Sequence, residues 1–490
     1  MSLRSDNPHM LSSLLRARLL FRSGLLQNLF SIATGDGIAK LITFFVFAYI
    51  ARVLSPTYFG ILTFASAFVG FFLPFVDYGF GFIGTREVSR NAQVLTQFVK
   101  NVVLIRLILA VLSFCVLLVI TSFVAFSVIE RRVIMLYGLG FLAAVFSLAW
   151  AYQAVGKTGW FVVERLVQAL PYAVGVLFFV KGTEDVALVP LFAFVSSLFG
   201  VVVVILGFLP RRWKRSSSVD FSFCWSLLRS AFPLFLSLFL VQIGASFSTA
   251  LLGFLSSKEE VGYFSAAFKV ILVIAILPNL LWSSFYPFLS RYADSESQRE
   301  KVLGIFLKYT ALVGIPISFL GFAFSGGIVS FIYGEQYGSA VLPLQILFVS
   351  VAFQFFGFAF TKPLPALGKE NLYLKYLSIG AGVNVVGGSL LIALFGATGG
   401  AVTTLLAELL VAIFSFLYIR TIARLKLLRN LLLSAVGSGL SYLCVLVAQR
   451  ILHLGFFLEV LVAIVVYLFF LKFTATASLR DFLEPEFISP

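Results

Sequence analysis

Apolar stretches of about 20 residues follow one another along the whole chain, separated by short segments that contain charged residues, glycine or proline. A helix of about 20 apolar residues crosses the hydrocarbon core of a bilayer, which is about 30 Å thick. A soluble fold could not bury this much apolar surface, since 60% of the residues are hydrophobic and only 12% are charged, about half the usual charged fraction. The sequence therefore predicts an all-α integral membrane protein with about 14 transmembrane helices. The expected spans are 28–50, 57–77, 103–125, 133–155, 160–180, 187–209, 231–254, 262–289, 306–331, 342–361, 374–395, 400–419, 431–449 and 456–473.

Basic residues are concentrated in alternate segments between these spans. The chain has 36 Lys and Arg against 21 Asp and Glu, a formal net charge of +15. With the N-terminus on the inner side, 27 basic residues fall in the segments on that side and six fall in those on the opposite side. Inner loops of membrane proteins carry such an excess of Lys and Arg. The charge therefore indicates that both termini are cytoplasmic, and we expect no nucleic acid partner.

The chain also contains a loose internal repeat. Residues 54–65 resemble residues 255–267, and each copy follows the first span of a block of six. Chance similarity in a biased composition is the alternative to duplication. Because six is an even number, two duplicated blocks would insert the same way up and enclose a central cavity, as in transporters that work by alternating access.

Two lobes and two further helices make up the expected organisation. The N-terminal residues carry leucines and arginines at spacings that favour a short amphipathic helix at about residues 10–23, lying on the inner membrane surface; disorder is the alternative. We expect a cytoplasmic amphipathic segment at 1–24, a six-helix lobe at 25–210, a cytoplasmic linker at 211–230, a second six-helix lobe at 231–425, and two helices with a cytoplasmic tail at 426–490.

The motifs of soluble catalysis are absent or out of context. The two histidines, His9 and His453, have no plausible partners in sequence, and the three cysteines have no paired spacing. The glycines at 79, 81 and 84 follow a membrane span, whereas a dinucleotide-binding motif follows a strand. Residues 156–158 resemble the end of a phosphate-binding loop, but the earlier glycine of that motif is replaced by alanine at 151. We expect no enzyme activity, no metal and no cofactor, with H⁺ or Na⁺ coupling left open.

Two charged residues lie inside the first span. Lys40 is near its middle, and Asp36 precedes it by four residues on the same helical face. A charge at such a depth costs about 2.5 to 3.5 kcal/mol unless it has a partner or a watery cavity. One hypothesis is a cavity-lining pair, in which Lys40 attracts an anionic substrate and Asp36 binds a coupling cation or orients Lys40. The alternative is a structural pair buried between helices.

Other charged residues near or within spans are further candidates. Lys269 could face the cavity or snorkel to the interface. Glu164 and Arg165 could line the cavity, with Arg165 as a bidentate phosphate ligand, or both could reach the membrane interface. Glu408 could be a protonatable coupling site. The candidates for a gate or cytoplasmic rim at the end of the second span are Asp77, Arg86 and Glu87.

Several motifs together resemble a known family. Residues 52–60, then 77–80 leading to 85–87, resemble the N-terminal signature of bacterial polysaccharide-unit flippases of the Wzx type, and residues 261–267 and 331–337 are similar to their second-lobe signatures. The family belongs to the multidrug/oligosaccharidyl-lipid/polysaccharide (MOP) exporter superfamily. The resemblance implies two six-helix, MATE-like lobes around a V-shaped cavity. It does not extend to Asp36, Lys40 or Lys269, which are candidates on physical grounds alone.

The resemblance also implies a function. The expected substrate is an undecaprenyl-pyrophosphate-linked oligosaccharide, moved to the outer leaflet for O-antigen or another cell-surface polysaccharide. Membrane lipids and the polysaccharide polymerase and ligase machinery are the expected partners. A cation-coupled multidrug exporter and a peptidoglycan-precursor flippase are the alternatives within transporters. A membrane-embedded glycosyltransferase or polymerase is disfavoured, because it would need a large outer loop with catalytic residues.

Overall fold

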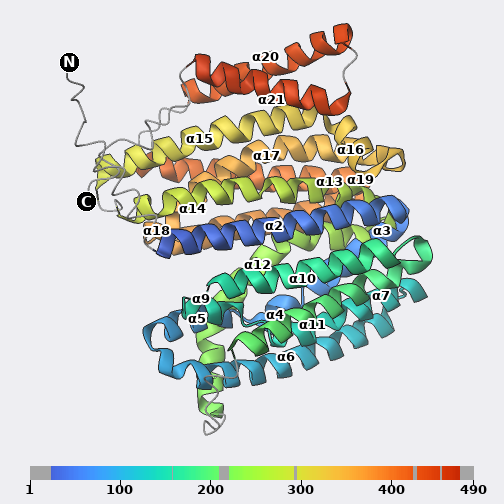
Figure 1. Ribbon diagram of the computed structural model, residues 1–490, viewed down its shortest axis with the longest axis vertical. Coiled ribbons are helices and arrows are strands. Elements are labelled where there is room, and N and C mark those ends of the chain that lie inside the picture. The colour runs from blue at the N-terminus through green and yellow to red at the C-terminus, as the bar shows by residue number, and fades with distance from the viewer. Residues whose placement is uncertain are drawn as a thin grey trace, which may run out of the picture.

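The structure is a computed structural model that describes residues 24–156, 158–208, 220–291, 295–422, 428–452 and 455–474. Within these ranges every regular element is a helix (Figure 1). The amphipathic helix expected at about residues 10–23 lies outside the described residues. The helices run roughly parallel to one another, as apolar helices that cross one bilayer must, and they are arranged in two lobes and a terminal pair.

The first lobe contains α2 (Gly24–Val53), α3 (Pro56–Gly70), α4 (Leu73–Asp77), α5 (Phe80–Arg90), η1 (Ala92–Val94), α6 (Leu95–Phe123), α7 (Val128–Gly138), α8 (Gly140–Val145), α9 (Ala149–Ala154), α10 (Thr158–Phe179), η2 (Thr183–Ala187) and α11 (Leu188–Phe208). The second lobe contains α12 (Phe221–Leu255), α13 (Lys258–Ile274), α14 (Ile276–Arg291), α15 (Glu296–Ala323), α16 (Ser325–Tyr333), η3 (Glu335–Ala340), α17 (Val341–Thr361), α18 (Pro363–Ala366) and α19 (Glu370–Ile422). The terminal pair is α20 (Leu428–Leu452) and α21 (Phe456–Phe473), which pack beside α15.

The span count agrees with the expected fold. Twelve stretches of the described chain are long and apolar enough to cross a membrane. One of them, Glu370–Arg420, has 51 residues, or about 77 Å of helix at 1.5 Å per residue. Its backbone turns at Gly396, where φ is 53° and ψ is −129°, so it supplies two spans. With α2 added, the fourteen expected spans are present, and the prediction of a polytopic helical membrane protein is confirmed.

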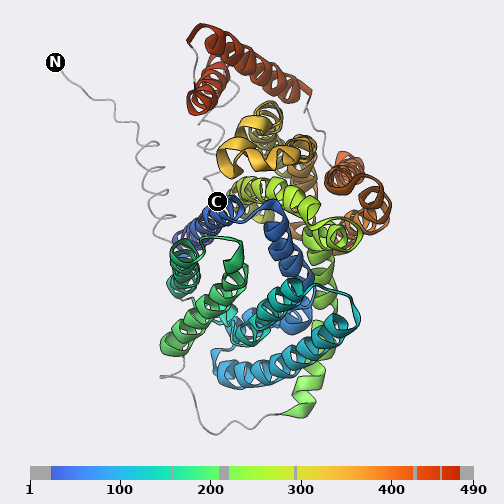
Figure 2. The same cartoon turned by 90° about the vertical axis from the view of Figure 1, so that its right-hand side faces the viewer.

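Helix α12 lies along both lobes (Figure 2). It begins at Phe221, so its first ten residues occupy part of the stretch 211–230 that the sequence predicted to be a linker. Asp220 caps this end, because its carboxylate accepts the backbone N–H groups of Ser222 and Phe223 at 2.9 and 3.1 Å. The bond from Phe223 is the main reason that the pKa of Asp220 lies below its usual range. Buried Asn101 of α6 accepts the N–H of Asp220 at 3.1 Å, which fixes the start of α12 to the first lobe.

The buried apolar residues show where the lobes meet. The largest cluster contains residues of both lobes, such as Phe59 and Phe64 of α3 and Phe264 of α13. A second cluster is formed by α5, α6, α9 and the first part of α12, and a third by α14, α15, α17 and α19. The last two clusters lie at the end of the molecule that carries α5, α9 and α18 (Figure 1). The lobes are therefore fused at the opposite end, which carries α3, α7 and α16, and have separate cores at this one.

Candidate functional site

A cavity of about 470 Å³ lies between the lobes, lined by α2 on one side and by α13 and α14 on the other. We call it the interlobe cavity. Lys40 and Lys269 both line it. The ammonium nitrogen of Lys269 lies 4.1 Å from the centre of the Phe47 ring, a cation–π contact between the lobes. The structure thus brings two of the candidate cations to one cavity.

Two further cavities continue from the interlobe cavity into the first lobe. The middle cavity, of about 400 Å³, shares Lys40, Thr43 and Phe47 with the interlobe cavity. The N-lobe cavity, of about 390 Å³, shares six lining residues with the middle cavity: Ser66, Tyr137, Arg165, Gln168, Ala193 and Ser197. Cationic side chains therefore lie at both junctions of the row, with Lys40 at the first and Arg165 at the second.

Glu164 and Arg165 enter the row from α10. The side chain of Arg165 lies against the Phe161 ring, with Cζ 5.2 Å from the ring centre. Glu164 is only 2% exposed, and one of its carboxylate oxygens accepts a hydrogen bond from Gln168 Nε2 at 3.4 Å. Gln168 is one helical turn further along, so the two polar side chains occupy the same face of α10. The other oxygen, Oε2, has no hydrogen-bond partner among the described residues.

The remaining candidates lie apart from this row. Asp36 is within α2, but its side chain is outside the described part of the structure. Glu408 of α19 lies 3.5 Å from the amide nitrogen of Gln354 on α17 and does not line any of the three cavities. Arg86 and Glu87 form an exposed ion pair of 3.0 Å at the end of α5.

Asp77 pairs with Arg106 of α6. Arg106 is 1% exposed within α6, where one terminal nitrogen bonds Asp77 and the other donates to the carbonyl oxygen of Ser147 at 2.7 Å. Asp77 ends α4, and Ser147 lies between α8 and α9. Arg106 therefore holds together the points at which the second and fourth spans are broken. Apolar residues on both sides of Arg106 in the sequence were the signal that it lies within the membrane.

We predict that Arg106→Met destabilises the protein strongly. Loss of the guanidinium would leave Asp77 and the Ser147 carbonyl without their partner. Removing one member of a buried ion pair lowers the free energy of unfolding by about 3 to 5 kcal/mol. We expect a loss near the lower value, because Asp77 is half-exposed and water can solvate its carboxylate. The measurement is the midpoint of thermal unfolding of the purified protein in detergent. Arg86→Met is the matched control, since the Arg86 side chain is 61% exposed in its pair with Glu87. Equal unfolding midpoints for the two variants would contradict the assignment.

The fused end of the lobes is built on a reciprocal contact between two glycines. A Cβ atom added to Gly60 of α3 would lie 1.7 Å from the carbonyl oxygen of Lys258, and one added to Gly262 of α13 would lie 2.1 Å from the carbonyl oxygen of Pro56. Each glycine thus faces the backbone at the start of the other helix. These are equivalent positions of the two similar segments. The two helices approach so closely that any side chain larger than hydrogen would collide with backbone.

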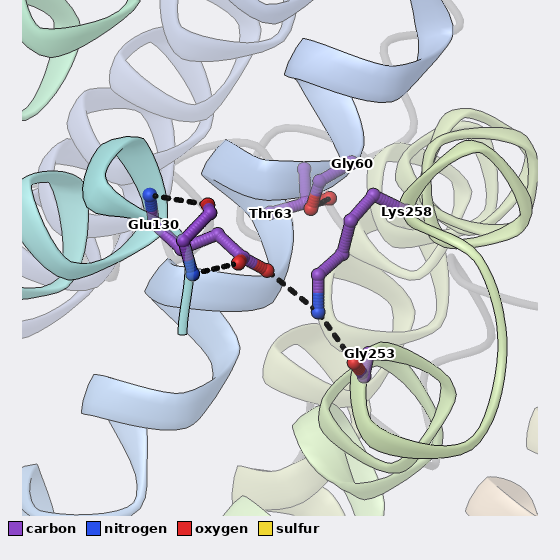
Figure 3. A network of polar contacts seen from close by, with 6 residues as sticks. Gly60, Thr63, Glu130, Gly253 and Lys258 are labelled. Carbon is purple, nitrogen blue, oxygen red and sulfur yellow. Dashed lines mark hydrogen bonds and ion pairs between the residues drawn. The ribbon is translucent and has the colours of Figure 1, made fainter. Parts of the chain in front are cut away.

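Polar contacts surround this crossing. Lys258 forms an ion pair of 2.9 Å with Glu130 of α7 and also donates to the carbonyl of Gly253 (Figure 3). Arg52, at the end of α2, donates from Nε to the carbonyl oxygen of Ile332 at 2.8 Å and from Nη2 to that of Phe331. Gln336 donates to the Arg52 carbonyl at 3.2 Å. Except for the bond to Gly253, these contacts join the two lobes, and we call them the closure contacts. The pairing of these charged residues could not be predicted from the sequence, because the partners are far apart along the chain.

The side chains that line the three cavities are suited to binding a ligand. Among the described residues, no group of three or more His, Cys, Asp or Glu side chains could hold a metal ion. The cavities instead combine Lys and Arg side chains with hydroxyl and amide groups and with apolar surface. Such a set suits an amphiphilic anion, because cations bind its charge while hydroxyls and amides bind its polar part.

Two helical lobes, fused at one end around a row of cavities with cationic side chains, define a polytopic membrane transporter. Comparison with known proteins shows the particular family. The family model described as polysaccharide biosynthesis protein matches residues 25–293. The chain therefore belongs to this family.

Relatives and solved structures agree with this assignment. A protein assigned as an O-antigen transporter in Escherichia coli (strain K12) is 23% identical over 80% of this chain and 96% of its own length. Its counterpart in Shigella dysenteriae is 25% identical over 79% of this chain and 98% of its own. The fold is similar to the lipid II flippase MurJ in an inward closed conformation, with a TM-score of 0.72 and 16% identity over 92% of this chain and 99% of that one. An inward-facing MATE transporter of the MOP superfamily gives a TM-score of 0.61, with 14% identity over 78% of this chain and 94% of that one.

Proposed function

We propose that this protein moves undecaprenyl-pyrophosphate-linked oligosaccharide units from the inner to the outer leaflet of a bacterial cytoplasmic membrane, for the synthesis of a cell-surface polysaccharide. The observation that carries the proposal is the row of three cavities, in which Lys269, Lys40 and Arg165 follow one another. Lys binds phosphate as a point charge, and Arg binds it through two parallel hydrogen bonds. The names of the relatives, O-antigen transporters and a lipid II flippase, support a lipid-linked sugar as the substrate.

The same geometry suits alternating access. In this proposal both termini are cytoplasmic, and the fused end that contains Gly60 and Gly262 faces the outside. Release of the substrate then requires the closure contacts to separate while the separate cores at the other end come together. A transporter that rocks in this way needs no catalytic groups, and we treat the protein as a carrier that is not an enzyme.

The membrane potential can drive the outward step. A negative charge that leaves an inside-negative cell gains about 2.3 kcal/mol for each 100 mV, so a pyrophosphate could be expelled without a coupled ion. Asp36 and Glu408 remain our candidates for H⁺ or Na⁺ coupling. In the proposed sequence, the polysaccharide polymerase and ligase take the exported unit from the outer leaflet, and this consumption of product favours net export.

Mass analysis of lipids from cells depleted of the protein tests the proposal. We expect undecaprenyl pyrophosphate carrying a complete sugar unit to accumulate, and surface polysaccharide to fall, because assembly would continue on the inner leaflet without export. The high structural similarity to MurJ favours a peptidoglycan-precursor flippase as the second candidate. Accumulation of lipid II alone would support that candidate. Unchanged lipid-linked pools would contradict both.

A further inference from the structure

The two ends of the cavity row differ in chemistry. Apart from the two lysines, the interlobe cavity is lined mainly by apolar side chains, among them Phe44, Leu272 and Ile276. The N-lobe cavity contains Ser66, Tyr137, Ser197, Gln168 and the Glu164–Arg165 pair. A row that is apolar at one end, cationic at its junctions and rich in hydroxyl and amide groups at the other matches a molecule whose charge lies between an apolar part and a polar part.

The order of groups in a lipid-linked sugar follows this gradient. Its isoprenoid chain, diphosphate and sugar are joined in that sequence, so a diphosphate near Lys40 and Arg165 would have its chain on one side and its sugar on the other. The interlobe cavity, which α14 helps to line, is mainly apolar and suits the chain. The N-lobe cavity lies beyond Arg165, within the first lobe, and its volume of about 390 Å³ falls in the usual range for small-molecule sites.

One carboxylate oxygen that faces the N-lobe cavity, Glu164 Oε2, is available to accept a hydrogen bond from a ligand. Glu164 Oε2 is buried and has no partner among the described residues, although Oε1 contacts Gln168. Buried carboxylate oxygens in folded proteins nearly always accept a hydrogen bond, because leaving them unpaired is costly. The hydroxyl groups of a sugar are donors of the required kind, and Gln168, Ser66 and Ser197 supply further donors and acceptors around the same space.

We propose, on the basis of the function proposed above, that the N-lobe cavity is the carbohydrate subsite and that Glu164 is a residue that determines sugar specificity by accepting a hydroxyl hydrogen bond. Arg165 binds the diphosphate at the entrance to this subsite. The subsite recognises the first sugars of the unit, which lie next to the diphosphate.

Binding measurements with two lipid probes test this inference. The probes are undecaprenyl pyrophosphate without sugar and the lipid-linked oligosaccharide extracted from depleted cells, each titrated by native mass spectrometry into the purified full-length protein. We expect Glu164→Ala to weaken binding of the oligosaccharide lipid by at least about tenfold, as loss of a hydrogen bond to a charged group does. Glu164→Gln keeps an oxygen that accepts a hydrogen bond but loses the charge, so it should weaken the same binding by a smaller factor. Binding of undecaprenyl pyrophosphate should change by less than about twofold, on the same affinity scale.

Controls separate the ways in which the inference could fail. The control is Glu296→Gln, which makes the same chemical change at an exposed residue in the first turn of α15, outside the cavities. It should alter the affinity for neither lipid probe. An equal loss for both probes would show that Glu164 acts on the diphosphate or on folding, and would overturn the proposal. So would unchanged affinities combined with loss of a Na⁺ or pH dependence of transport, which would identify Glu164 as a cation site. Failure of undecaprenyl pyrophosphate to bind the unaltered protein would instead contradict the proposed function itself.

Discussion

Replacing Lys40 and Lys269 together with methionine should abolish export of lipid-linked sugar while leaving the protein folded in the membrane. The two ammonium groups line the same interlobe cavity, and a hydrogen bond to a charged group contributes about 1.5 to 3 kcal/mol. Each loss should therefore weaken diphosphate binding about tenfold to a hundredfold. Methionine is unbranched and only one atom shorter than lysine, and its thioether packs well on aromatic rings, so most of the packing of residue 269 against Phe47 is retained.

The measurement is restoration of surface polysaccharide in a deletion strain, together with the amount of protein in isolated membranes. Lys40→Arg and Lys269→Arg preserve the charge and should retain most activity. Lys362→Met is the matched control: its ammonium also lies over an aromatic ring, 5.1 Å from the centre of Phe358, but Lys362 does not line the three cavities. Full complementation by the double methionine variant would show that these cations do not bind the substrate.

Gly60→Ala should have the second large effect, because a single methyl group is enough to separate the lobes. The added carbon would lie 1.7 Å from a backbone carbonyl oxygen, and backbone can move aside only if the helices α3 and α13 move apart. Overpacking of a tight interface costs about 1 to 3 kcal/mol. Alanine is favoured over glycine in helices by about 1 kcal/mol, so this substitution would stabilise α3 taken alone. A loss of function could therefore not be explained by destabilisation of that helix.

Accessibility at the fused end measures this effect directly. Thr63→Cys, in a background without the three native cysteines, places a thiol at a position that is 5% exposed. We expect Gly60→Ala to increase its labelling by a membrane-impermeant maleimide added from outside, and to reduce export. Gly304→Ala, in α15, adds the same methyl where no heavy atom lies within 4 Å, so it should change neither result. Unaltered labelling in the Gly60 variant would contradict a role of this contact in closure.

The positions of the spans could be predicted because the bilayer sets the length of apolar helices. The expected span 456–473 coincides with α21, and 342–361 differs from α17 by one residue. The breaks in the second and fourth spans could not be predicted in the same way. At these breaks Arg106 contacts both Asp77 and the Ser147 carbonyl, which are far apart in sequence and are brought together only by packing.

The candidate site was partly visible in the sequence for a related reason. Lys40 and Lys269 stand out because a charge inside an apolar run needs an explanation, and the structure places both in one cavity. Ser66 and Ser197 are neutral and short, so nothing in the sequence distinguishes them from packing residues. Glu130 and Lys258 escaped notice because they lie near span ends, where a charged residue is ordinary.

The contact between Gly60 and Gly262 has the symmetry of an isologous interface, in which the same patch is used twice and each copy touches its equivalent. Such an interface is usually found between two identical subunits, whereas here both patches belong to one polypeptide. A side chain at either position would push the two helices apart whatever residue occupies the other, so α3 and α13 can meet this closely only when both positions are glycine.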